Sequence, residues 1–114
     1  MSNLVGEINQ LHAHICQALA DPKRILILYA LHERPRNVTE LTELYDFSQP
    51  TVSRHLRFLR ERGLVTSERE GNTIIYSLVD PRVIEALDLM RAVMTNILSR
   101  SAELVEHLEE EGKE

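Results

Sequence analysis

The fold is decided in the middle of this 114-residue chain by the stretch Ser48-Gln49-Pro50-Thr51-Val52-Ser53-Arg54-His55-Leu56-Arg57-Phe58-Leu59-Arg60. Ser48 is a favourable N-cap, and Pro50 suits the first helical turn, where a missing N–H has no cost. Val52, Leu56 and Leu59 recur at helical spacing and predict one apolar face. The other face carries arginines and small polar side chains. The stretch is therefore predicted to be a helix with one face in the core and one basic face in solvent.

A shorter helix is predicted before this one. Asn37 followed three residues later by Glu40 has the pattern of a capping box, which marks a helix start. Leu41 and Leu44 are expected to face the core. The two helices and the short turn between them have the pattern of a helix-turn-helix.

A β-hairpin is predicted after the basic helix. Gly63 suits the left-handed residue that ends a helix. Two strand-like runs come next, Leu64 to Arg69 and Thr73 to Leu78, joined by Glu70-Gly71-Asn72. A hairpin directly after a helix-turn-helix is typical of a winged-helix domain, in which the helix-turn-helix and the hairpin here span residues 37–78.

Two further helices are predicted before residue 37. Apolar residues at steps of three and four make the segment within residues 1–20 amphipathic: Leu4, Ile8, Leu11, Ile15 and Leu19. Asp21-Pro22 is a cap followed by proline at the first helical position, and it opens a second helix. That helix, ending near Glu33, is apolar nearly all round and is expected to be the most buried element.

The last helix is predicted to begin after Asp80-Pro81 and to cover residues 80–111. A heptad repeat runs along it through Val83, Leu87, Met90, Met94, Ile97, Leu104 and Leu108, interrupted only by Ser101. Such a helix is roughly 40 Å long at 1.5 Å per residue, more than a small domain can cover. We expect a two-fold dimer that uses this stripe and Leu4, Ile8 and Leu11 of the first helix. A core helix with a frayed end is the alternative.

These elements together predict a mainly α protein with a small β-hairpin, in the α+β class. The expected order is ααααββα, in one winged-helix domain over residues 1–114. The chain is expected to form a homodimer through its first and last helices.

The basic helix points to DNA. An α-helix fits the major groove, arginine can pair bidentately with guanine, and hydroxyls and amides can read other base edges. The net charge of −5 argues against this interpretation until its distribution is considered. Residues 54–69 hold five arginines against two glutamates, whereas residues 103–114 hold six glutamates against one lysine. Phosphates respond to charge within about 10 Å, so an acidic tail far from the duplex does little harm.

Other classes of protein are disfavoured. The first seven residues lack the basic start and apolar run of a signal peptide, and no apolar stretch is long enough to span a bilayer. The lone Cys16 excludes an intramolecular disulfide framework and favours the cytoplasm. Glycine-rich phosphate loops, HExxH and GxSxG are absent from the sequence, so an enzyme is not expected. A winged-helix module that contacts protein instead of operator DNA is the alternative function.

The chain resembles the ArsR/SmtB family of small prokaryotic winged-helix repressors over nearly its whole length. The motifs that carry the resemblance are Ala18-Leu19-Ala20-Asp21-Pro22-Lys23-Arg24, Ser48 to Leu56, Leu59-Arg60-Glu61-Arg62-Gly63-Leu64-Val65 and the hairpin Arg69 to Tyr76. The resemblance implies a homodimer that represses a nearby operon until an inducer lowers its DNA affinity. It also implies an operator with an inverted repeat.

The predicted DNA contacts come from the helix and from the resemblance. Base reading is expected from Gln49, Thr51, Ser53 and Arg54, which match the family's base-reading positions. Arg57, Arg60 and Arg69 are expected to touch phosphates, together with Asn72 or Thr73 at the hairpin tip. Ser48 and His55 complete the predicted set, with packing beneath the helix as the alternative for His55.

The inducer is not predicted by the sequence. The family's cysteine site in the third helix and its Asp-x-His site on the last helix are both missing here. One remaining candidate is a metal or thiol sensor formed by His12 and Cys16 of the first helix with His107 of the partner subunit, since the resemblance implies that the first helix packs near the partner's last helix. Ordinary packing of Cys16 and ordinary surface histidines are the stronger alternative. We therefore predict no cofactor, and leave open a metal ion at this site, an organic ligand between the long helices and constitutive DNA binding.

Overall fold

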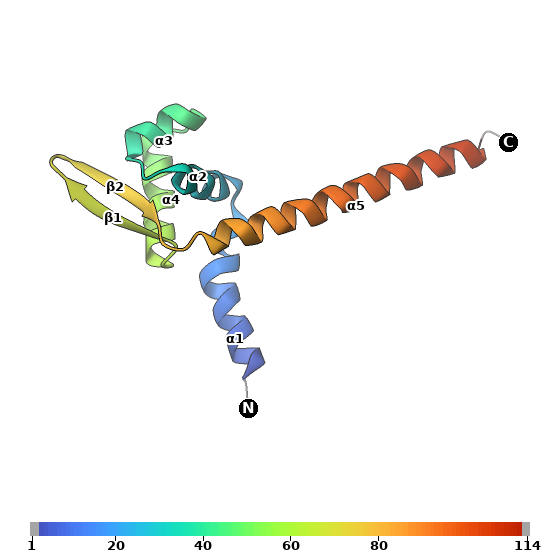
Figure 1. The fold of residues 1–114 in the computed structure, drawn as a ribbon, viewed down its shortest axis with the longest axis horizontal. Coiled ribbons are helices and arrows are strands. Elements are labelled where there is room, and N and C mark those ends of the chain that lie inside the picture. Colours follow the sequence, from blue (N-terminus) through green and yellow to red (C-terminus); the bar gives the residue numbers. More distant parts are fainter. Residues whose placement is uncertain (1–2, 113–114) are drawn as a thin grey trace. The chain divides into compact units, whose positions relative to one another are not determined.

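The computed structural model describes residues 3–112 and confirms the order ααααββα (Figure 1). Its elements are α1 (Leu4–Leu11), a π-helical segment (His12–Cys16), a 3-10 turn (Ala18–Ala20), α2 (Pro22–Glu33), α3 (Val38–Tyr45), α4 (Gln49–Glu61), β1 (Val65–Glu70), β2 (Thr73–Leu78) and α5 (Arg82–Gly112). The chain forms two units, one ending at Pro81 and one beginning at Arg82. Residues 1, 2, 113 and 114 lie outside the described residues, as do the parts of the predicted domain that fall on them.

The first helix differs from the prediction of one continuous amphipathic helix. After α1 the backbone widens into the π-helical segment, in which the N–H of Gln17 donates to the carbonyl of His12 over 3.0 Å. It then tightens into the 3-10 turn, where Ala18 is fully buried. Mixed hydrogen-bond spacing of this kind leaves no periodic trace in the apolar pattern.

Local signals place α2 correctly. The Asp21 carboxylate accepts a hydrogen bond from the N–H of Lys23 over 2.8 Å, and Pro22 occupies the first turn. Ile27, Leu28 and Leu31 form the centre of the core. Its apolar residues are not all covered, since Leu26 is 40% exposed.

The capping box of α3 is confirmed. The N–H of Asn37 donates to Glu40 Oε1 over 3.2 Å, and the N–H of Glu40 donates to Asn37 Oδ1 over 2.8 Å. Leu41 is fully buried, as predicted, but Leu44 is 48% exposed, so its predicted place in the core is wrong. This two-turn helix packs against α4, and Leu41 in its middle is covered while Leu44 near its end is not.

Helix α4 ends in a Schellman motif, as its glycine predicted. Gly63 has a φ of 80°, and its N–H donates to the carbonyl of Arg60 over 3.0 Å. The N–H of Leu64 donates to the carbonyl of Leu59 over 3.0 Å. The chain turns sharply here and enters β1 with Leu64 and Val65 buried.

The hairpin is antiparallel, with Val65 opposite Leu78 and Glu70 opposite Thr73. Its two strands project outward from the end of α4 (Figure 1). Its base is held by Arg36, which exchanges two backbone hydrogen bonds with Tyr76, of 3.1 and 2.8 Å. The buried Arg36 side chain also donates from Nε to the carbonyl of Ala30 over 2.9 Å. This arginine therefore ties the hairpin to the last turn of α2.

Helix α5 is 31 residues long, which corresponds to about 46 Å. Ile84 and Leu87 are buried and Val83 is half-buried, whereas the heptad residues from Met90 onward are mostly exposed. No helix among residues 3–112 is both long enough and apolar enough to cross a membrane.

Candidate nucleic-acid interface

The outward face of α4 is built by the periodicity of its sequence. Val52, Leu56 and Leu59 are fully buried and fix the orientation of the helix. The opposite side exposes five of the predicted contact residues: Gln49, Ser53, Arg54, Arg57 and Arg60. The structure thus brings most of the predicted base-reading set onto one accessible surface, in the N-terminal half of the helix.

The three arginines on the exposed side of α4 differ in their partners. Arg57 Nε lies 3.7 Å from Glu61 Oε1, one turn along the helix. Arg60 Nη1 donates to Ser67 Oγ over 3.3 Å and so reaches across to β1. The Arg54 side chain has neither a hydrogen bond nor an ion pair within residues 3–112. Its guanidinium is therefore available to a ligand without breaking an internal contact.

Arg62 is one of the five arginines of residues 54–69, but its side chain is half-buried and lies against the protein. Its guanidinium carbon lies 4.5 Å from the centre of the Phe58 ring, in a cation–π contact. Its Nε is buried and has no hydrogen-bond partner among the described atoms. The exposed positive charge therefore comes from Arg54, Arg57, Arg60 and Arg69.

Ser48 and Thr51 are hydrogen-bonded to each other at the start of α4. Ser48 Oγ accepts from the N–H of Thr51 over 3.3 Å and donates to Thr51 Oγ1 over 2.8 Å. Thr51 is half-buried. Both residues shape the N-terminus of the helix, and Thr51 presents less of its side chain than Ser53 does.

His55 lies apart from the rest of the predicted set. Its residue exposure is 8%, and its ring faces the start of α2, with Nδ1 3.4 Å from Arg24 Nη1 and Nε2 3.9 Å from Asp21 Oδ2. Burial lowers the pKa of His55 below its ordinary value, and Arg24, Arg54 and Lys23 add to the lowering while Asp21 opposes it. His55 therefore packs beneath α4, which is the alternative to DNA contact, and it is not part of the candidate DNA surface.

The hairpin supplies the second part of the interface. Arg69 and Asn72 are exposed and Thr73 is half-exposed, and Gly71 makes the tight turn with a φ of 63°. A polar hollow of about 370 Å³ lies between the hairpin tip, Ser53 and the start of α3. Its lining includes Asn37 and Thr39, which were not predicted to belong to the interface. The capping box at Asn37 was the available signal, because it marks a helix N-terminus with free N–H groups.

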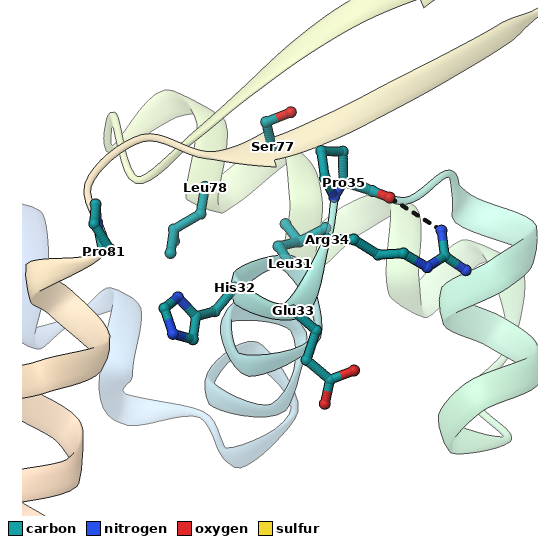
Figure 2. A pocket seen from close by; sticks show the side chains of 8 residues that line it. All are labelled: Leu31, His32, Glu33, Arg34, Pro35, Ser77, Leu78 and Pro81. Atoms are coloured by element: carbon teal, nitrogen blue, oxygen red, sulfur yellow. Dashed lines mark hydrogen bonds between the residues drawn. The ribbon is translucent and has the colours of Figure 1, made fainter.

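A second hollow, of about 400 Å³, lies between the end of α2 and β2 (Figure 2). Its lining includes Leu31, His32, Pro35 and Leu78, and none of the predicted site residues. Arg34 Nη1 donates to the carbonyl of Pro35 over 3.3 Å.

The three predicted sensor residues lie on the π-helical segment and on α5. Among residues 3–112 there is no group of three or more histidine, cysteine or acidic side chains that could hold a metal ion. His12 and Cys16 are both exposed, so Cys16 is not a core residue of this chain. His107 Nε2 lies 3.1 Å from Glu111 Oε1 on α5.

Comparison with known proteins identifies the chain's relatives. Residues 21–67 match the family described as bacterial regulatory protein, arsR family. The HTH-type transcriptional regulator Rv0081 of Mycobacterium tuberculosis is 36% identical over 90% of this chain and 91% of its own length. The crystal structure of Rv0081 superposes with a TM-score of 0.72 over 83% of this chain and 96% of that one. The chain belongs to the arsR family of bacterial regulatory proteins.

Two other relatives fit the same assignment. The transcriptional regulator NmtR of M. tuberculosis is 46% identical over 67% of this chain, a match that spans 63% of that regulator. The solution structure of Mb0332 from Mycobacterium bovis, described as a homodimeric winged helix-turn-helix DNA-binding domain, is 26% identical. It has a TM-score of 0.72 over 88% of this chain and 93% of that one. This arsR-family protein is thus a DNA-binding regulator of transcription and not an enzyme.

Proposed function

We propose that this arsR-family regulator binds an operator by placing α4 in the major groove and the hairpin tip on the adjacent backbone. The observation that carries the proposal is the outward face of α4, where the unpartnered Arg54 lies beside Ser53 and one turn after Gln49 and Pro50. Arginine and glutamine can each form paired hydrogen bonds with a base edge. Gln49, Ser53 and Arg54 are the proposed base-reading residues, with Thr51 at the edge of this surface.

The remaining contacts are assigned to phosphates. Arg57 and Arg60 lie farther along α4, and Arg69, Asn72 and Thr73 lie near the hairpin tip. Contacts of this kind fix the protein's position on the duplex without reading sequence. Arg60 is already held by Ser67 and would link the two contacting elements.

We also propose that the regulator acts as a homodimer on an operator with an inverted repeat. Met90, Met94, Ile97, Leu104 and Leu108 of α5 are each more than half exposed in the single chain, as are the flanking Val93, Leu98 and Val105. In α1, Leu4, Ile8 and Leu11 are between 43 and 62% exposed. An apolar stripe this long on a heptad spacing is typical of a helix that packs on another chain. Mb0332, a relative with the same fold, is described as homodimeric.

Dimerisation determines the symmetry of the operator and the spacing of its half-sites. Two α4 helices related by a two-fold axis read two half-sites about 34–36 Å apart, or one helical turn of DNA. A dimer bound to such a site blocks access of other proteins to the same DNA. We therefore propose repression by occupancy of an operator, in the bacterial cytoplasm.

The test compares two arginine variants on the same helix, Arg54→Ala and Arg57→Ala. Both remove one positive charge from an exposed side chain, so their effects on long-range attraction are similar. Arg54→Ala is expected to weaken operator binding by about 1–3 kcal/mol more than it weakens random-duplex binding, and so to lower the operator preference. Arg57→Ala is expected to weaken both and to reduce the dependence on salt. Equal loss of operator preference in the two variants, or none in Arg54→Ala, would contradict the assignment.

A further inference from the structure

Arg24 makes contacts that join three segments of the chain. Its Nε donates to the carbonyl of Ala18 over 2.7 Å, and its Nη2 donates to the carbonyl of Gln17 over 2.9 Å. Both carbonyls belong to the turn that precedes α2. The same guanidinium lies 4.4 Å from the centre of the Phe58 ring and reaches His55 with Nη1. One side chain of α2 therefore contacts the preceding turn and two residues of the DNA-reading helix α4.

The contact between Arg24 and His55 sets the protonation state of the imidazole. Arginine can only donate, so at 3.4 Å from Nη1 the His55 Nδ1 must accept and carry no hydrogen. The hydrogen of the neutral ring is then on Nε2, which faces Asp21 Oδ2 at 3.9 Å. A charged imidazole carries hydrogens on both nitrogens. Protonation would remove the acceptor and place two cations in contact.

The surroundings of His55 disfavour that charge. The ring is buried, and the cations Arg24 and Lys23 of α2 and Arg54 of α4 all lower its pKa. Asp21 is the one group among the described residues that acts in the opposite direction. The pKa of Asp21 is itself lowered, first by the N–H of Lys23, so this carboxylate stays ionised in the range where histidine titrates.

We propose that Arg24 and neutral His55 are positioning residues that hold α4 in its DNA-reading orientation, and that protonation of His55 weakens sequence-specific DNA binding. His55 directly follows Arg54, so a shift of its backbone moves the proposed base-reading side chain. The inference rests on the proposed function of α4. It concerns the arrangement of the helix, since His55 itself is buried and does not face the duplex.

The direction of the pH effect comes from linkage. A histidine whose pKa is lowered by the fold favours the intact arrangement at high pH, and this advantage is lost as the pH falls below the ordinary value of about 6.5. A positive charge added near DNA also attracts every duplex equally. The informative quantity is therefore the ratio of operator affinity to random-duplex affinity, in which this general attraction cancels.

The experiment measures that ratio by fluorescence anisotropy from about pH 8 to about pH 5.5, a range that includes the ordinary histidine pKa. Wild type is compared with His55→Asn, whose amide oxygen supplies an acceptor near the position of Nδ1 but does not titrate. His32→Asn, at an exposed histidine, is the matched control. Circular dichroism at each pH verifies that every variant is folded.

The ratio is expected to fall in wild type and in His32→Asn, by up to about tenfold, since one linked proton changes an equilibrium by at most tenfold for each pH unit. It is expected to stay nearly constant in His55→Asn. A constant ratio in wild type, or an equal fall in His55→Asn, would overturn the inference. Failure of wild type to prefer the operator at pH 8 would instead overturn the proposed function.

A second measurement needs no variant. Nitrogen NMR of the imidazoles in the wild-type protein reports which nitrogen carries hydrogen. We expect His55 with an unprotonated Nδ1 and a pKa below the ordinary histidine value of about 6.5. A hydrogen on Nδ1 at neutral pH would contradict the arrangement.

The role of Arg24 is tested by Arg24→Lys, which keeps the positive charge but not the two carbonyl contacts. This variant is expected to lose operator preference.

Discussion

Arg36 and Tyr76 exchange both of their backbone hydrogen bonds, of 3.1 and 2.8 Å, although they are 40 residues apart in the sequence. This pair adds a third backbone segment to the base of the two-stranded hairpin. The hairpin tip carries the predicted phosphate contacts, so its position relative to α4 decides whether both reach one duplex. The Arg36–Tyr76 pair and the Arg60–Ser67 hydrogen bond fix that position from two sides.

The first prediction concerns the Arg36 side chain, which caps α2 through the carbonyl of Ala30. Arg36→Ala leaves that buried carbonyl without its donor and is expected to lower the free energy of unfolding by about 1–3 kcal/mol. Urea denaturation measures the change. The control is Arg34→Ala, since Arg34 is largely exposed and its ion pair with Glu40 is weakened by solvent screening. Equal losses in the two variants would show that burial of Arg36 is not important.

The second prediction concerns pH and the start of α3. Hydrogen bonding from Arg34 and from the N–H of Asn37 lowers the pKa of Glu40 below its ordinary value of 4.5. A lowered carboxyl pKa contributes stability above the ordinary value, which is lost as the pH falls through the folded-state pKa. Stability should therefore decline less steeply between about pH 5 and pH 3 in Glu40→Gln than in wild type. Parallel stability curves for the two proteins would contradict the role of this carboxylate.

The third prediction tests the apolar stripe of α5. Met94→Glu places a charge in the middle of the stripe, and burying it against a second chain would be costly. The variant is expected to dissociate in sedimentation experiments at concentrations where wild type is a dimer. Thr95→Glu adds the same charge to the next position, outside the heptad stripe, and should remain a dimer. If Met94→Glu also remains a dimer, the stripe is not the interface.

The fourth prediction concerns Cys16, which is exposed and has no cysteine partner in the chain. Cys16→Ser is nearly isosteric and removes no core contact. Operator affinity in the absence of added metal or oxidant should change by less than about 0.5 kcal/mol, as for other surface substitutions. A larger loss, measured by anisotropy in reducing buffer, would mean that the thiol contributes to folding or binding. His14→Gln, at another exposed residue of the same segment, is the control.

Much of the fold is predictable because its signals are local. Asp21, Asn37, Ser48 and Gly63 each begin or end a helix through contacts within a few residues, and all four act as predicted. Val52, Leu56 and Leu59 fix the face of α4 by periodicity alone, and that face determines which side chains are exposed.

Features that the sequence did not predict depend on contacts between distant residues. Arg36 and Arg62 look like surface arginines, but one caps a helix and the other packs on Phe58. The ring of His55 turns inward because Asp21 and Arg24 lie there, more than 30 residues earlier in the chain. Leu26 and Leu44 match helical periodicity but remain exposed, since periodicity does not tell how much of an apolar stripe a neighbour covers.

The most direct test of the central claim is fluorescence anisotropy of the wild-type protein against DNA from upstream of its own gene, at several salt concentrations. A random duplex of the same length is the reference. We predict binding to the upstream DNA that is about a thousandfold tighter or more, with affinity for both duplexes falling steeply as salt rises. Equal, weak binding to both duplexes, unchanged by removal of metal and by reduction, would contradict the account of α4 as a sequence-reading helix.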